Sequence, residues 1–172
     1  MSLLAYPLLM TKKSFAIFSM NSVIAHILNK YLNKFINKEI YFAVDKPGRA
    51  VIMLMNKLRS SGGKVHLIAE KDLISFIDTW EVLCSGAEFI CKNGIGSTQG
   101  MDAIAKICKK CKKSYYIFAG SKVFLMDQVK LFASQCIIPF TNVTYLLTER
   151  RLYTSQDIIA YFSGSHKLLQ NN

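Results

Sequence analysis

The sequence predicts an α/β fold: a single Rossmann-like, doubly wound domain with a mainly parallel sheet and helices on both faces. Short segments rich in aromatic and β-branched residues alternate with segments of helical periodicity, as in consecutive βαβ units. The apolar segments are continuous, which is typical of strands covered on both faces. With 172 residues, 51% hydrophobic and 19% charged, the chain can bury one core and is not of the disordered class.

The first half of the chain alternates expected strands and helices. The strands are expected at 14–19, 39–44 and 64–69. Two helices separate them, at 21–35 with an N-cap at Asn21 or Ser22, and at 50–59. The first helix has one apolar face, made of Ile24, Ile27, Leu28, Tyr31 and Phe35. Ser61-Gly62-Gly63 end the second helix.

The second half continues the alternation and then loses it. We expect a short helix, a strand, a glycine-containing loop, a long helix and a strand, at 71–77, 80–84, 93–96, 98–113 and 114–119. Residues 122–139 show no period and are interpreted as an irregular crossover. A late strand at 143–147 precedes a terminal helix at 154–162, capped by Thr154 or Ser155.

These elements define the expected domain organisation. Residues 1–13 form an N-terminal extension, 14–163 the Rossmann-like domain and 164–172 a flexible tail. No membrane-spanning helix is expected, because the uncharged stretch Ser14 to Asn29 is shorter than the roughly 20 residues that such a helix needs, and no membrane is among the expected partners. Five cysteines without framework spacing favour a reducing compartment, and we expect a cytoplasmic protein.

The charge is strongly basic. The chain has 22 Lys and Arg against 11 Asp and Glu, a net charge of +11. The excess is concentrated at the front, since residues 1–64 carry ten basic and two acidic side chains. Such a balance favours a polyanionic partner: RNA, DNA or an anionic membrane surface. The alternative is a solvated, lysine-rich surface.

Two groups of lysines are candidate nucleic-acid contacts. The first crowds the end of the long helix and consists of Lys106, Lys109, Lys110, Lys112 and Lys113, with Tyr115 and Tyr116 just beyond. One or two cations would complement a helix C-terminus, but five repel one another, which favours contact with a phosphate backbone. The second group consists of Lys12, Lys13, Lys30, Lys34 and Lys38.

The segment Asn93–Thr98 (NGIGST) is a second candidate site. Between a strand and a helix, its glycines would allow backbone N–H groups to converge on a phosphate at the helix N-terminus. The alternative is a plain connection with a Ser/Thr cap. The segment follows the fourth strand rather than the first, where a dinucleotide fingerprint belongs, and we expect no cofactor.

The remaining reactive side chains form no clear catalytic set. Cys108 and Cys111 make a CxxC within a helix; with Cys84 and Cys91 they could bind zinc, or act in redox chemistry, but helix packing is the preferred interpretation and no metal is expected. His66 is interpreted as a packed strand residue. Glu88 and Asp45 are the acids nearest strand ends, without paired carboxylates or a Ser/His/Asp set, so no catalytic residue is assigned.

Several segments, in order, resemble the regulatory subunits of translation initiation factor 2B and their enzyme relatives, methylthioribose-1-phosphate and ribose-1,5-bisphosphate isomerase. Phe15–Val23 (FAIFSMNSV) resembles the first strand and its Thr-His-x-x-Ser/Thr loop, and 44–47 (VDKP) the motif after the second strand. Residues 86–98 (GAEFICKNGIGST) resemble the Gly-Ala-Asp/Glu, Asn-Gly and Ile-Gly-Thr signatures. Residues 115–119 (YYIFA) resemble the Pro-Phe-Tyr-Val-Ala strand, and 145–162 the C-terminal helix region. The resemblance spans 14–163 and implies the family's Rossmann-like C-terminal domain, without its helical N-terminal domain.

The resemblance implies a pocket whose chemistry is changed. The corresponding residues are Met20, Asn21, Lys46, Glu88, Asn93, Gly94, Gly96, Ser97 and Thr98. The family's proton-transferring cysteine and aspartate are replaced by Met20 and Glu88, and the arginine after the second strand by Lys46. Methionine can neither donate nor accept a proton, and proton transfer contributes about 10²–10⁴-fold to a rate. We therefore expect a vestigial pocket in a protein that is not an enzyme.

The expected function is that of a non-catalytic domain that acts in translation by docking on the ribosome or another RNA through its basic surfaces. A second possibility is a truncated regulatory subunit that contacts initiation factor 2 or other exchange-factor subunits, paired as a homo- or hetero-dimer. A sugar-phosphate isomerase with altered chemistry and a purely structural oligomerisation module are the third and fourth.

Overall fold

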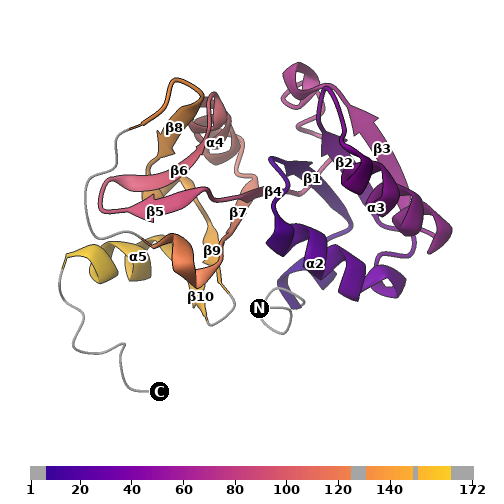
Figure 1. Ribbon diagram of the computed structural model, residues 1–172, viewed down its shortest axis with the longest axis horizontal. Coiled ribbons are helices and arrows are strands. Elements are labelled where there is room, and N and C mark those ends of the chain that lie inside the picture. Colours follow the sequence, from indigo (N-terminus) through magenta and orange to yellow (C-terminus); the bar gives the residue numbers. More distant parts are fainter. Residues whose placement is uncertain (1–6, 125–130, 149–150, 164–172) are drawn as a thin grey trace. The chain divides into compact units, whose positions relative to one another are not determined.

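The computed structural model describes residues 7–124, 131–148 and 151–163. The chain divides into two compact units, Met1–Gly86 and Ala87–Asn172 (Figure 1). The expected tail 164–172 and the first six residues of the expected N-terminal extension lie outside the described residues.

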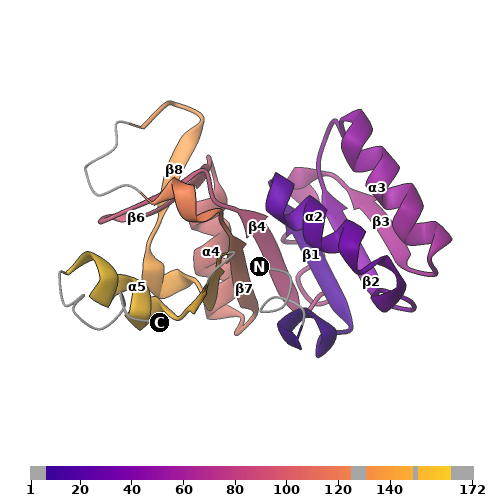
Figure 2. The ribbon, with the colours of Figure 1, turned by 60° about the horizontal axis from the view of Figure 1, so that its bottom comes forward.

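The N-terminal unit contains four parallel strands in the order β4-β1-β2-β3. Their bounds are Val82–Gly86 for β4, Ser14–Phe18 for β1, Glu39–Ala43 for β2 and Lys64–Ile68 for β3. Phe15 in β1 pairs with Ile40 on one side and with Val82 on the other. Helices α2 (Ser22–Lys30) and α3 (Arg49–Ser60) contact each other and lie in front of β1, β2 and β3 in Figure 2.

Local sequence explains the ends of both helices. The Asn21 side chain caps α2 by accepting a hydrogen bond from the N–H of Ile24 at 3.0 Å, as predicted. The helix ends earlier than expected, and the 3₁₀ turn η1 (Leu32–Lys34) follows it. Phe35 then enters the core and packs edge-on against Phe15 at 5.8 Å. Gly62 ends α3 with a φ of 88°, a conformation that glycine adopts without strain.

Three predictions in this unit are wrong. The expected helix at 71–77 is only a 3₁₀ turn, η2 (Glu70–Asp72), followed by turns, because several of its backbone bonds join residues three apart, such as Leu73 N–H to Glu70 O. The fourth strand runs over 82–86 instead of 80–84. The strand β3 is also not covered on both faces, since His66 and Leu67 are exposed.

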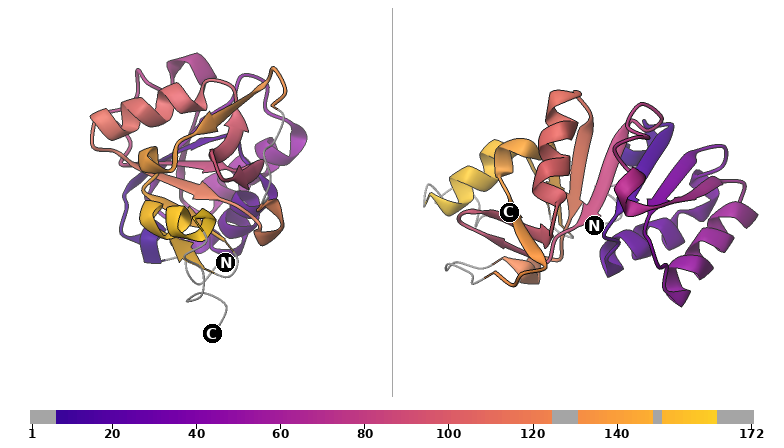
Figure 3. Two further views of the ribbon diagram at one scale, coloured as in Figure 1. Left: turned by 90° about the vertical axis from the view of Figure 1, so that its left-hand side faces the viewer. Right: turned by 90° about the horizontal axis from the view of Figure 1, so that it is seen from above.

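The C-terminal unit contains two groups of strands. β7 (Ser114–Phe118) pairs in parallel with β9 (Tyr145–Leu147), which pairs antiparallel with β10 (Leu152–Tyr153). A separate antiparallel sheet has the order β5-β6-β8, with bounds Phe89–Cys91, Gly94–Thr98 and Gln135–Ile138. Helix α4 (Met101–Lys110) contacts β7 and β8, and α5 (Ser155–Phe162) contacts the 3₁₀ turn η4 (Phe140–Asn142); the left view of Figure 3 faces this unit. A further 3₁₀ turn, η3, covers Ser121–Val123.

The second sheet is the main departure from the predicted architecture. The expected loop at 93–96 is the turn and second strand of a β-hairpin, and the expected crossover at 122–139 contains β8. The long helix therefore begins at Met101 rather than Thr98, after Gly100 with a φ of 88°. The late strand and the terminal helix are confirmed, with Thr154 as the cap. The predicted α/β class with a mainly parallel main sheet is confirmed.

Candidate functional site

The glycines of the segment Asn93–Thr98 serve sheet packing. A Cβ on Gly94 would lie 2.5 Å from the carbonyl oxygen of Ile138, and one on Gly96 would lie 2.2 Å from the ring of Phe89. Gly96 is the cross-strand partner of Phe89, whose ring occupies the space a side chain would fill. The segment is therefore not the glycine loop at a helix N-terminus that the phosphate-site hypothesis required.

The other C-terminal residues of the expected pocket belong to the same small sheet. The Ser97 hydroxyl is fully buried and has no hydrogen-bond partner among the described residues, whereas the Thr98 carbonyl accepts a bond from the Cys136 thiol at 3.1 Å. Glu88 is exposed, and its carboxylate accepts a hydrogen bond from the Gln135 amide. Asn93 is exposed in the hairpin turn.

The N-terminal unit holds a pocket of about 150 Å³ at the carboxyl ends of β1 and β2. Its lining residues are Ile17, Ser19, Met20, Phe42, Ala43, Val44, Val51 and Glu70. Met20 lines this pocket, but Asn21 and Lys46 are not among the lining residues: Asn21 caps α2, and Lys46 is exposed. Among the described residues that line this pocket, Glu70 carries the only acidic or basic side chain. The lining therefore contains no pair of side chains that could act as general acid and general base.

The nine expected pocket residues are divided between the two units. Met20, Asn21 and Lys46 belong to the N-terminal unit, and the other six belong to the C-terminal unit. Within the C-terminal unit, Gly94, Gly96, Ser97 and Thr98 share strand β6. That all nine form one pocket stays a prediction.

The first lysine group surrounds the C-terminal end of α4. Lys106, Lys109, Lys110 and Lys112 are exposed, and Lys113 is half-buried. The helix ends at Lys110 rather than at the expected 113; Lys112, two residues beyond, has a φ of 56°, and the N–H of Lys113 bonds back to the Cys108 carbonyl at 2.8 Å. Lys106 lies 3.8 Å from Asp102, the one acidic side chain of this helix. The end of α4 is therefore a concentrated positive surface, whereas Tyr115 and Tyr116 are buried.

The second lysine group is less available for an external partner. The ammonium of Lys38 donates to the carbonyls of Met10, at 3.0 Å, and of Lys12, and it lies 5.7 Å from the centre of the Phe15 ring. Burial lowers the pKa of this amine. Lys12 is half-buried, 4.0 Å from Glu81, whereas Lys13, Lys30 and Lys34 are exposed.

The cysteines provide no metal site within the described residues. No three His, Cys, Asp or Glu side chains lie together there as metal ligands. In the CxxC, Cys108 is buried and Cys111 is exposed; burial raises the pKa of the Cys108 thiol to about 12. The chemistry of this pair therefore rests on the exposed Cys111 thiol.

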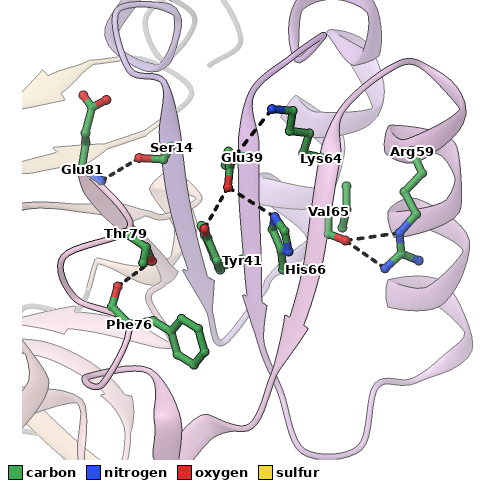
Figure 4. A network of polar contacts seen from close by, with 10 residues as sticks. All are labelled: Ser14, Glu39, Tyr41, Arg59, Lys64, Val65, His66, Phe76, Thr79 and Glu81. Atoms are coloured by element: carbon green, nitrogen blue, oxygen red, sulfur yellow. Dashed lines mark hydrogen bonds and ion pairs between the residues drawn. The ribbon is translucent and has the colours of Figure 1, made fainter.

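A polar network on strands β2 and β3 was not predicted. The Glu39 carboxylate accepts from the Tyr41 hydroxyl at 2.9 Å and lies 3.3 Å from His66 Nε2 and 3.7 Å from Lys64 Nζ (Figure 4). The Tyr41 bond is the main cause of a lowered Glu39 pKa, and burial raises the pKa of Tyr41. The sequence does carry a signal, because Glu39 and Tyr41, like Lys64 and His66, are two residues apart and so share a face.

These elements define a Rossmann-like α/β protein, and solved structures of that class are similar to it. The chain superposes on eIF2B beta from Chaetomium thermophilum with a TM-score of 0.71 and 16% identity, covering 93% of this chain and 50% of that one. For the tetrameric eIF2B-beta2-delta2 complex from C. thermophilum the TM-score is 0.71 and the identity 17%, and the match covers 89% of this chain and 53% of that one. For 5-methylthioribose 1-phosphate isomerase from Pyrococcus horikoshii OT3 the TM-score is 0.68 and the identity 12%, and the match covers 90% of this chain and 55% of that one.

The comparisons confirm the expected resemblance at the level of fold. The chain spans about half the length of these similar proteins. No protein-family model and no curated protein sequence matches it. Among the helices of the described ranges, none has the length and apolar character needed to cross a bilayer.

Proposed function

We propose that this protein is a non-catalytic domain of the initiation-factor-2B type that acts in translation, in the cytoplasm, by docking on ribosomal RNA through the basic end of α4. The observation that carries the proposal is the exposure of Lys106, Lys109, Lys110 and Lys112 around one helix end. Repulsion among these lysines raises the electrostatic free energy of the surface unless bound anions neutralise their charges. Each phosphate contact also releases counterions, which favours binding.

The pocket supports a non-catalytic role. Beside the Met20 thioether, its lining has one acidic or basic side chain among the described residues, Glu70, so a carboxylate that removed a proton there would have no second acid or base beside it. Incubation with methylthioribose-1-phosphate or ribose-1,5-bisphosphate is expected to give no isomerised product. Turnover above the buffer rate that is lost in Glu70→Gln would contradict this part of the proposal.

Co-sedimentation with ribosomes tests the docking surface. The variant with glutamine at Lys106, Lys109, Lys110 and Lys112 keeps side-chain length and removes four charges. A matched control places glutamine at four exposed lysines elsewhere, namely Lys57, Lys71, Lys92 and Lys122. Binding at physiological salt is expected for the wild type and the control, and its loss only for the α4 variant. Equal behaviour of the two variants would refute the placement.

A second candidate is a short regulatory subunit of the exchange factor. Its support is the similarity of fold to the eIF2B-beta2-delta2 complex. In this case the chain would pair with itself or with another such subunit, or contact initiation factor 2. Sedimentation of the purified protein, alone and mixed with beta or delta subunits, distinguishes the two: a stable mixed complex together with no ribosome binding would favour the subunit.

A further inference from the structure

A pair of parallel rings occupies the outer edge of the N-terminal sheet. Tyr41 in β2 and His66 in β3 are register partners, and their rings stack with centroids 4.6 Å apart and planes at 16° (Figure 4). Tyr41 is 8% exposed, whereas the His66 side chain is 44% exposed. Since β3 is the last strand in the order β4-β1-β2-β3, no further strand of the described chain follows His66 at this edge.

The Glu39 carboxylate contacts both rings. Glu39 accepts from the Tyr41 hydroxyl at 2.9 Å and lies 3.3 Å from His66 Nε2. The short distance to Glu39 and the stacking on Tyr41 together fix the orientation of the imidazole ring. A ring fixed before binding loses little conformational entropy when a planar group stacks on it.

Two cationic side chains are anchored on strand β3, the strand that carries His66, or on its partner strand. Lys64, 60% exposed and two residues before His66, lies 3.7 Å from Glu39 and offsets its charge. The exposed Arg59 donates from Nε and Nη2 to the carbonyl of Val65, at 3.3 and 3.1 Å, which keeps its guanidinium at the same edge (Figure 4). Aromatic rings accompanied by cations are typical of sites for single-stranded nucleic acid, because bases stack on the rings and the cations neutralise the phosphates.

We propose that His66 is a stacking site for an unpaired RNA base, with Arg59 and Lys64 contacting the adjoining phosphates. The inference rests on the proposed function in its ligand class, RNA, but it concerns a different surface from the end of α4. It specifies the form of RNA: a base within a duplex is already stacked on its neighbours, so the ligand is a single-stranded segment or loop.

A short single-stranded RNA with a terminal dye and one internal 2-aminopurine tests the site. Anisotropy of the dye reports binding, and quenching of 2-aminopurine reports stacking. The wild type is expected to bind and quench. His66→Phe, which keeps a ring, is expected to quench. His66→Ala is expected to lose quenching and about tenfold in affinity, within the range that removal of one stacking side chain gives. When the same RNA is annealed to its complement, addition of the protein is expected to cause no quenching of 2-aminopurine.

Each failure has its own pattern. Undiminished quenching in bound His66→Ala overturns the stacking site and leaves the proposed function intact. Quenching that persists while the α4 glutamine variant binds as tightly as the wild type supports the stacking site and overturns the α4 surface. No rise in anisotropy at low salt overturns both. Thermal melting of His66→Ala verifies that the fold is retained.

Discussion

At the scale of single residues, Gly96 shows how little space the second sheet leaves. Its missing side chain is replaced by the ring of Phe89, which a Cβ would approach to 2.2 Å. Gly96→Ala is expected to lower the free energy of unfolding by about 1–3 kcal/mol, as overpacking of a close-packed interior does. The midpoint of urea unfolding measures this.

A matched substitution separates packing from the general effect of replacing glycine. Gly120 lies in the same unit with a φ of −75°, and a Cβ added there would meet no atom of the described residues within 4 Å. Gly120→Ala should therefore leave stability within about 0.5 kcal/mol of the wild type. Equal midpoints for the two variants would show that Phe89 moves aside without cost.

The thiols make a second prediction at this scale. Cys111 is exposed, Cys136 is half-buried with a pKa raised by burial, and the remaining three cysteines are buried. In the native protein at pH 8, a thiol-specific reagent is expected to modify Cys111 first. Cys111→Ser should abolish this fast phase. A fast phase of unchanged size in that variant would place the reactive thiol elsewhere and exclude the exposed end of the CxxC as its source.

At the scale of elements, α5 depends on a reciprocal cap that is sensitive to acid. The Thr154 hydroxyl accepts from the N–H of Asp157 at 3.2 Å, and the Asp157 carboxylate accepts from the Thr154 N–H at 2.8 Å and from its hydroxyl at 2.7 Å. These bonds hold the pKa of Asp157 below its ordinary value. A carboxylate whose pKa is lower in the folded state stabilises the fold above its unfolded-state pKa of about 3.9. That stabilisation is lost as the pH falls through the folded-state value.

Asp157→Asn should reveal this dependence. At pH 7 the variant is expected to be less stable than the wild type by about 0.3–1 kcal/mol, the range for one charge at a helix N-terminus. Near pH 3 the difference in stability should shrink, because protonation of the Asp157 carboxylate then begins to remove the negative charge that the variant lacks. Melting curves of both proteins between pH 7 and pH 3 measure the difference. A difference that is constant over this range would exclude the carboxylate charge as its source.

The elements also show what the sequence can and cannot predict. Features fixed within a few residues were predictable: the Asn21 cap, the end of α3 at Gly62 and the Thr154 cap. The hairpin of β5 and β6 also has a local signal, since Asn-Gly between apolar segments is typical of a hairpin. The pairing of β6 with β8 has none, because Ile95 and Ile138 are far apart in the chain and short apolar segments of this kind occur in loops as well as in strands.

The same distinction applies to the candidate site. The lysines at the end of α4 follow from sequence alone, because neighbours on one helix end are exposed together. That Lys38 binds backbone carbonyls rather than an external anion depends on a segment 26 residues away. The ring pair of Tyr41 and His66 depends on the register of two strands, which the sequence suggests only through the alternation within each of them.

At the scale of the whole molecule, a net charge of +11 promotes some binding to any polyanion, and the placement of charge must be separated from its amount. The logarithm of the affinity for RNA falls linearly with the logarithm of the salt concentration, with a slope of about 0.7–0.9 per phosphate contact. If the end of α4 supplies the contacts, glutamine at Lys106, Lys109, Lys110 and Lys112 should reduce this slope by about 3.

The control with glutamine at Lys57, Lys71, Lys92 and Lys122 has the same net charge as the α4 variant, and it should bind more weakly at low salt only, with a slope close to that of the wild type. A salt series of ribosome co-sedimentation gives the three slopes. The salt dependence of binding reflects the number of phosphate contacts rather than the total charge. Equal slopes for the two variants would therefore mean that the lysines of α4 contact no more phosphates than the four control lysines do. The basic surface would then be a solvated one, and the docking function would have to reside elsewhere in the molecule.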